Sequence, residues 1–225
     1  IRAIGRGIDS KADITVDGSH MLCYPGLVNT HHHLYQQFSR NLPEVQGFEL
    51  FDWLRYLYDI WKNIDEELIT LSSLTGMGEL MKNGCTTCFD HHYVFPRDGG
   101  DLIAAQFEAA GLIGMRMHAS RGSMDLSKKD GGLPPDSVVQ TIDEIMKDSV
   151  RLIEKYHDPS KGSMRQIALA PCSPFSVSGE LLRESAALAR QYGVRLHTHL
   201  CETKDEESYT LSLIHISEPT RPISI

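Results

Sequence analysis

Histidines dominate the residues of this sequence that could do chemistry, because seven of the eleven stand in three short clusters. The clusters are His31-His32-His33, His91-His92, and His197 with His199. Side chains two residues apart in a strand point to the same face, so the two histidines of each His-x-His pair project together. At the carboxyl ends of parallel strands, the two pairs would converge on one point. Neutral imidazole is the commonest metal ligand, so the spacing predicts a metal centre.

Zinc is the ion that these nitrogen donors favour. A catalytic zinc keeps one coordination position open for water and lowers the pKa of that water to about 7. The same nitrogen donors also bind iron, so Fe²⁺ is an alternative to Zn²⁺ as the bound ion. A single histidine is more often packed or hydrogen-bonded than ligating, but two His-x-His pairs favour the metal.

Glu202 follows His199 by three residues, just beyond a predicted strand. A carboxylate beside a metal-activated water can accept its proton and deliver it to a leaving nitrogen, which is general acid–base catalysis. An ordinary solvated glutamate at a helix start, within the acidic run of residues 202–207, accounts for the spacing equally well.

Two further pairs of reactive residues lie within or directly after the predicted strand at residues 85–90. His91 and His92 follow it directly, which places them among the strand ends. Contact with a substrate and simple loop polarity are both open for them. Cys85 and Cys88 form a C-x-x-C pair that is more typical of core residues. The sequence lacks the His-x-Glu motif that accompanies Pro-Cys-x-x-Cys in zinc deaminases of the cytidine type.

Helical patterning alternates with short β-prone runs along the chain. Helices are predicted over residues 49–61, 65–83, 101–110, 137–156 and 179–192, and strands over residues 85–90, 113–119, 166–170 and 194–199. Short strands in residues 1–22 and a candidate buried strand at 22–29 precede them. Alternation of this length implies parallel βα units, in an α/β barrel or a doubly wound sheet. No G-x-G-x-x-G or G-x-x-x-x-G-K motif indicates a nucleotide cofactor.

Composition narrows the choice of partners. The net charge of −8 argues against binding to nucleic acid or to an anionic membrane. The sequence contains no apolar run of about 18 residues, the length needed to cross a bilayer. Five scattered cysteines, an odd number, favour reduced thiols and a cytoplasmic location. Trp53 and Trp61 are assigned to the core, and assembly into a homo-oligomer is left open.

Several motifs together resemble the amidohydrolase superfamily. Its metal-binding first strand resembles Pro25–His33 with Gln36, and its fifth-strand motif resembles His197–Thr203. Ala170–Pro174 is similar to the preceding strand end. Three further segments resemble the aminohydrolase branch that holds 8-oxoguanine deaminases, guanine deaminases and hydroxydechloroatrazine ethylaminohydrolases. These segments are Asp90–Tyr93, Arg121–Met124 and Gly131–Asp136.

The resemblance implies a (β/α)8 barrel of the TIM type with a small β-sandwich built from both chain ends. In this chain we expect residues 1–24 to be a remnant of the sandwich. Residues 25–209 would form a partial barrel that is truncated after about strand five. Residues 210–225 would be a non-native tail. The histidine of strand six and the aspartate of strand eight, which complete the family's metal site, are missing.

The resemblance also implies roles for individual residues. The metal ligands would be His31, His33 and His199, with His197 one layer deeper. Glu202 would shuttle protons. Contacts with a small heterocyclic substrate are assigned to Gln36, Arg121, His91 and His92. The implied activity is hydrolytic deamination of a purine-like heterocycle of the 8-oxoguanine or guanine type, with release of ammonia. Hydrolysis of an s-triazine or of another C–N bond on the same scaffold, and an inactive truncated fragment, are the alternatives.

Overall fold

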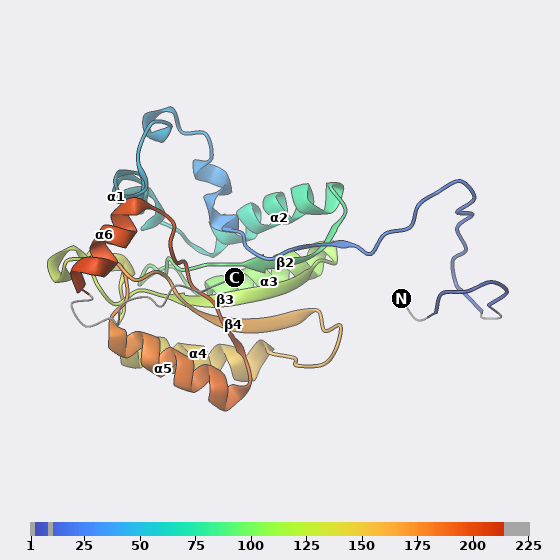
Figure 1. Ribbon diagram of the computed structural model, residues 1–225. Coiled ribbons are helices and arrows are strands. Elements are labelled where there is room, and N and C mark those ends of the chain that lie inside the picture. The colour runs from blue at the N-terminus through green and yellow to red at the C-terminus, as the bar shows by residue number, and fades with distance from the viewer. Residues whose placement is uncertain (1–2, 9–10, 214–225) are drawn as a thin grey trace, which may run out of the picture.

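The computed structural model describes residues 3–8 and 11–213, and its body is a parallel sheet with helices packed against it (Figure 1). Five strands pair in the order of the sequence, each parallel to its neighbours. They are β1 (Leu27–Asn29), β2 (Cys85–Asp90), β3 (Arg116–Ser123), β4 (Arg165–Pro171) and β5 (Arg195–Leu196). The sheet curls into a half-barrel, which confirms the predicted α/β class and a TIM-type barrel that reaches strand five.

Six α-helices and four short 3₁₀ helices connect the strands in the described part of the chain. The α-helices are α1 (Leu50–Trp61), α2 (Glu66–Lys82), α3 (Leu102–Ile113), α4 (Ile142–Tyr156), α5 (Gly179–Tyr192) and α6 (Lys204–Leu213). The 3₁₀ helices are η1 (Leu34–Ser39), η2 (Pro43–Val45), η3 (Lys128–Asp130) and η4 (Asp136–Val138). The predicted alternation of helix and strand is therefore confirmed.

Side-chain caps set where the helices begin. The Asp65 carboxylate accepts the Leu68 N–H at 2.8 Å before α2, and the Asp101 carboxylate accepts the Ala104 N–H at 3.2 Å before α3. Thr141 and Glu144 form a reciprocal capping box at the start of α4. Each cap satisfies backbone donors that the first helical turn leaves free.

Several elements differ from their predicted positions. Helix α4 begins at Ile142 and not at Ser137, and β3 covers Arg116–Ser123 and not residues 113–119. Of the buried strand predicted at 22–29, only Leu27–Asn29 forms, and its apolar side chains are exposed. Helix α3 runs past Gly111 and stops at Gly114, whose φ of 73° lies in the left-handed region that glycine adopts without strain. Strand β5 is shorter than predicted, but its extension still pairs with β4. The His197 N–H donates to the Leu169 carbonyl at 2.9 Å, and the His199 N–H donates to the Cys172 carbonyl at 2.9 Å.

The residues at the two ends of the chain either lie outside the half-barrel or are not among those that the structure describes. Residues 3–8 and 11–26 form no strand, and the chain before Gly26 runs away from the body with no neighbouring strand to pair with (Figure 1). The strands predicted there are therefore wrong for the described residues, and a sandwich remnant at 1–24 stays a prediction. Of the predicted non-native tail, residues 210–213 complete α6, and residues 214–225 lie outside the described residues.

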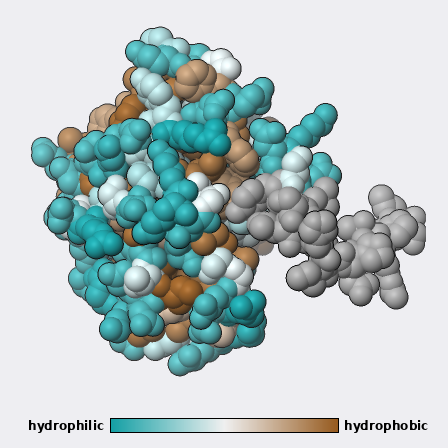
Figure 2. All heavy atoms as spheres, turned by 90° about the vertical axis from the view of Figure 1, so that its left-hand side faces the viewer, coloured by the Kyte–Doolittle hydropathy of each residue, from teal (hydrophilic) through white to brown (hydrophobic). Residues whose placement is uncertain are grey.

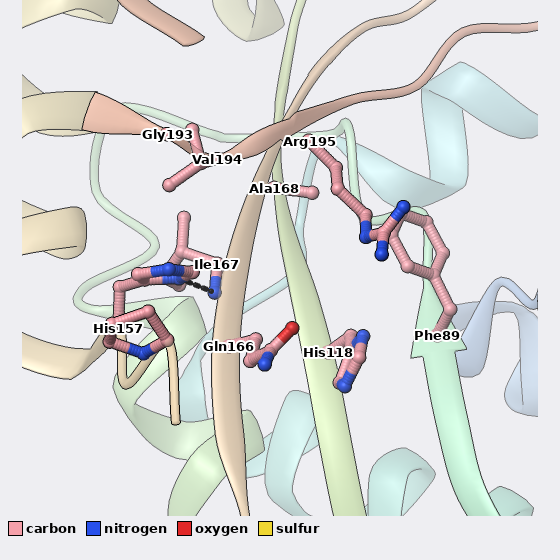
Figure 3. A pocket seen from close by; sticks show the side chains of 10 residues that line it. Phe89, His118, His157, Gln166, Ile167, Ala168, Gly193, Val194 and Arg195 are labelled. Carbon is pink, nitrogen blue, oxygen red and sulfur yellow. Dashed lines mark hydrogen bonds between the residues drawn. The ribbon is translucent and has the colours of Figure 1, made fainter. Parts of the chain in front are cut away.

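Side chains of β3 and β4 alternate between two environments, as the pleat of a strand requires. Met117, Ile167 and Leu169 are at most 2% exposed and belong to the hydrophobic core shared with the helices. His118 and Gln166 point to the opposite face, where they line a cavity of about 360 Å³ together with Arg195 (Figure 3). The concave face of the half-barrel is therefore polar beneath the strand ends.

The surface seen from the side of α1 and α6 mixes polar and apolar side chains (Figure 2). The strand edges of the half-barrel carry exposed apolar residues, with Leu27 60%, Val28 59% and Leu196 44% exposed. Among the described helices, none is both long enough and apolar enough to cross a membrane.

Gly122 lets β3 approach the segment that follows β2. Its N–H donates to the His92 carbonyl at 2.9 Å, and a Cβ built on Gly122 would lie 2.1 Å from that carbonyl oxygen. Gly122→Ala should therefore lower the free energy of unfolding by about 1–3 kcal/mol, the usual cost of overpacking. Urea denaturation followed by circular dichroism measures this change.

Gly78 provides the matched control, since it lies inside α2 and a Cβ there meets nothing within 4 Å. Gly78→Ala should leave stability unchanged or raise it by up to about 1 kcal/mol through helix propensity. Equal effects of the two substitutions would contradict the close approach at Gly122.

Candidate metal centre

Three imidazoles converge where β1 and β5 end. The Nε2 atom of His31 lies 3.1 Å from Nε2 of His33, which lies 3.2 Å from Nε2 of His199. Nitrogen donors that share a tetrahedral zinc at about 2.0–2.1 Å stand roughly 3.3 Å apart. The spacing of the three Nε2 atoms therefore fits donors directed at one ion.

Backbone carbonyls fix the tautomers of two of these rings. Nδ1 of His33 lies 2.7 Å from the His91 carbonyl oxygen, and Nδ1 of His199 lies 2.7 Å from the Cys172 carbonyl oxygen. A carbonyl only accepts, so each Nδ1 carries the proton and each Nε2 carries a lone pair. The two lone pairs face each other at 3.2 Å and repel unless a cation lies between them. This donor set fits a divalent metal.

The same environment keeps the imidazoles neutral. Burial is the largest cause that lowers the pKa values of His31, His33 and His199 from 6.5. The neighbouring histidines lower those of His31 and His33 further, because adjacent imidazolium charges would repel. Neutral imidazole is the form that binds a metal ion.

His197 lies beneath this triad. Its Nε2 is 2.9 Å from Nδ1 of His31, and its ring packs against Phe89 at a centroid distance of 4.6 Å. His197 is thus a hydrogen-bonding partner of His31, and its Nε2 does not join the three that converge.

His91 lies next to the triad. Nitrogen atoms of His31, His91 and His199 lie within 4.8 Å of one another. The His91 ring stacks face to face on His199, with centroids 4.2 Å apart and planes 9° apart. We take His33 as the third candidate ligand, because its Nε2 lies 3.1 and 3.2 Å from those of His31 and His199. His91 is fully buried, and its ring nitrogens have no hydrogen-bond partner among the described residues.

His92 points into the core. Its ring packs edge-on against Tyr35 and Phe95 at centroid distances of 5.1 and 4.8 Å. Burial lowers its pKa to about 3, so the ring is neutral. The structure does not bring His92 to the open side of the triad.

Gln36 lies in a cavity of about 430 Å³ that His31 and His33 also line. Its side-chain amide donates to the Tyr35 hydroxyl at 3.4 Å. The predicted substrate residue and two predicted ligands thus share one opening, which Trp53 closes on another side.

Arg121 lies elsewhere. Its side chain is 1% exposed on the helix-covered face of the sheet and stacks over Phe95 at 4.1 Å. Its Nε donates to the Asp148 carboxylate at 2.6 Å, and another donor reaches the Gln140 amide oxygen at 2.7 Å. The structure therefore does not place Arg121 beside the histidines, and its contacts tie β3 to α4 instead.

Glu202 stands on the turn between His199 and α6. Partial burial and the nearby Glu206 carboxylate raise its pKa, as befits a group that both takes up and releases a proton. Tyr93 also lies at the site, its ring centroid 5.3 Å from that of His33 and 5.8 Å from that of His199. No role was predicted for Tyr93, although two-residue periodicity after His91 places the two residues on one face.

A curled parallel half-barrel with imidazoles gathered at its strand ends has the architecture of the α/β barrel enzymes, whose sites lie at the carboxyl ends of the strands. Residues 22–221 match the Amidohydrolase family, and the chain belongs to that family. It is 48% identical over 195 residues to 8-oxoguanine deaminase of Pseudomonas aeruginosa, covering 87% of this chain and 43% of that protein. It is 42% identical over 202 residues to hydroxydechloroatrazine ethylaminohydrolase of Pseudomonas sp. strain ADP, covering 88% and 42%.

Solved structures give the same picture. The atrazine chlorohydrolase TrzN of Arthrobacter aurescens TC1 complexed with zinc superposes with a TM-score of 0.78 at 32% identity, covering 84% of this chain and 44% of that one. Guanine deaminase of E. coli superposes with a TM-score of 0.68 at 30% identity, covering 84% and 41%. The chain thus spans less than half the length of the relatives it matches.

The purified protein should bind one zinc ion through the triad. His33→Ala and His199→Ala should each weaken zinc binding at least about 10-fold, and the exposed His20 provides the control in His20→Ala. Because the ligand pKa values lie below 6.5, affinity should be constant from pH 8 to 7 and fall below pH 6.5, as protons compete for Nε2. Titration calorimetry measures both effects, and equal affinity in all three variants would contradict the triad.

Proposed function

We propose that the protein carrying this chain is a metal-dependent hydrolase that deaminates a purine-like heterocycle of the 8-oxoguanine or guanine type, with release of ammonia. The observation that carries this proposal is the convergence of three Nε2 atoms within 3.2 Å of their neighbours at the barrel mouth, two of them with lone pairs fixed by backbone carbonyls. The 48% identity to an 8-oxoguanine deaminase supports the substrate class.

The roles of the residues follow from their positions. A zinc or iron(II) ion held by His31, His33 and His199 would supply a Lewis acid that lowers the pKa of water. Glu202 would take one proton from the attacking water and deliver it to the ring nitrogen. It would then take the second proton from the hydroxyl of the tetrahedral adduct and deliver it to the departing amine. The ring carbon gains the water oxygen, the C–N bond breaks, and ammonia leaves.

Recognition of the heterocycle is assigned to the cavity beside the triad. The Gln36 amide carries both a donor and an acceptor, which match the alternating edge of a purine or pterin ring. The unpartnered nitrogens of buried His91 offer a second polar contact. The contact predicted for Arg121 has less support, because its guanidinium is bound by Asp148 and Gln140.

Hydrolysis of an s-triazine is the second candidate. Two comparisons favour it, the ethylaminohydrolase at 42% identity and the zinc complex of TrzN. Ammonia release from 8-oxoguanine, guanine and isoxanthopterin, set beside amine release from hydroxylated s-triazines, separates the two. Full zinc occupancy without turnover of any substrate would leave the metal-binding, non-catalytic alternative.

Glu202→Gln tests the proton shuttle. The variant should keep its zinc content and lose about 10²–10⁴-fold in kcat, because the amide cannot carry a proton. Asp205→Asn removes a charge from an exposed neighbour and should keep full activity. Ammonia release and metal analysis on the same samples give both values, and wild-type kcat in Glu202→Gln would exclude the assigned role.

A further inference from the structure

One residue of the acidic run 202–207 differs from the others. Glu206 is 1% exposed, whereas Glu202, Asp205 and Glu207 are exposed. A carboxylate is placed in such a position only when its oxygens have hydrogen-bond donors. The location of those donors indicates what Glu206 does.

Both carboxylate oxygens of Glu206 bind the turn that carries Glu202. Oε1 accepts the Cys201 N–H at 2.9 Å, and Oε2 accepts the Glu202 N–H at 2.7 Å. The Glu206 N–H in turn donates to the Thr203 hydroxyl at 3.3 Å, which caps α6. The Glu206 side chain thereby connects the turn that follows ligand His199 to the start of α6.

A helix cap alone does not account for these contacts. In a capping box the third helical residue reaches back to the N–H of the cap residue itself. Here Thr203 is the cap, and the Glu206 carboxylate reaches the two residues before it. Its acceptors therefore serve the turn at residues 201–202.

That turn needs external support. Cys201 has a φ of 60°, in the left-handed region that is unfavourable for a residue with a Cβ. Without an acceptor for its N–H, Cys201 would relax toward an extended conformation and swing the next residue away. The conformation of Cys201 thus sets the direction in which Glu202 leaves the backbone.

We propose that Glu206 is a positioning residue that holds the 201–202 turn and thereby fixes the direction in which the Glu202 side chain leaves the turn after His199. The inference rests on the proposed function of Glu202. The charge of Glu206 also adds to the rise in the pKa of Glu202, in the direction that favours proton retention.

Four variants of the full-length protein test this role: Glu206→Gln, Glu202→Gln, the double variant, and Glu207→Gln as the matched control. Glu207 is exposed and carries the same charge one residue further along α6. A glutamine at 206 keeps one acceptor and turns its amide NH2 toward the second N–H. We expect kcat to fall about 10–100-fold at unchanged KM and zinc content, as misplacement of a reacting group does.

Two readouts separate positioning from general stability. In the Glu202→Gln background, Glu206→Gln should cause no further loss of kcat, because a residue that acts through another has no effect once that other is gone. Amide hydrogen exchange should accelerate at Cys201 and Glu202 in Glu206→Gln and stay unchanged in Glu207→Gln.

Several results would overturn the inference. They are wild-type kcat in Glu206→Gln, an equal proportional loss on top of Glu202→Gln, and unchanged exchange at residues 201–202. If Glu206→Gln unfolds, Glu206→Asp takes its place, because the shorter carboxylate keeps its charge and reaches only one of the two amides. Unimpaired Glu202→Gln would instead overturn the proposed function and leave the exchange result to stand on its own.

Discussion

Two hydrogen bonds from imidazole Nδ1 atoms to backbone carbonyls are the constraint on which the site depends. They place the ring proton of His33 and of His199 on Nδ1. The Nε2 lone pairs of the two rings therefore face each other across 3.2 Å. Such an arrangement is unfavourable until a cation occupies it. A flexible surface would relieve the repulsion by turning the rings, so the scaffold must be rigid around them.

That rigidity comes from contacts between successive strand ends. The His91 N–H donates to the His32 carbonyl at 2.7 Å, so the segment that supplies the carbonyl for His33 is itself bonded to the first cluster. The Asp90 carboxylate accepts the N–H of Leu34 at 2.6 Å, and burial raises the pKa of Asp90 to about 7. Gly122 binds the next strand to this segment. Backbone groups and buried side chains at the ends of β1, β2 and β3 therefore hold the candidate ligands in place.

The convergence of the histidines was predictable from the sequence because strand periodicity is strict and histidine pairs are rare. Capped helices were predictable for a similar reason, since their caps are local. The carbonyls of His91 and Cys172 had no side-chain signature, and nothing in the acidic run distinguished Glu206 from its neighbours. The assignment of Arg121 rested on motif resemblance, which does not reveal the face of a strand on which a side chain lies. The strands predicted in residues 1–22 are absent from the described residues because no strand lies beside them to pair with. Periodicity along a sequence does not reveal whether a pairing partner exists.

The division between backbone and side chains bears on substrate choice. Carbonyls orient His33 and His199 whatever side chains surround them, so the same triad geometry tolerates extensive substitution elsewhere. The cavity at Gln36 is built from side chains and changes with each of them. Relatives between 48% and 27% identical carry names for purine, pterin, triazine and nucleoside substrates. Under the proposed function, the ring that is accepted would depend on the Gln36 cavity, while the turn held by Glu206 would serve the same proton transfer for every ring.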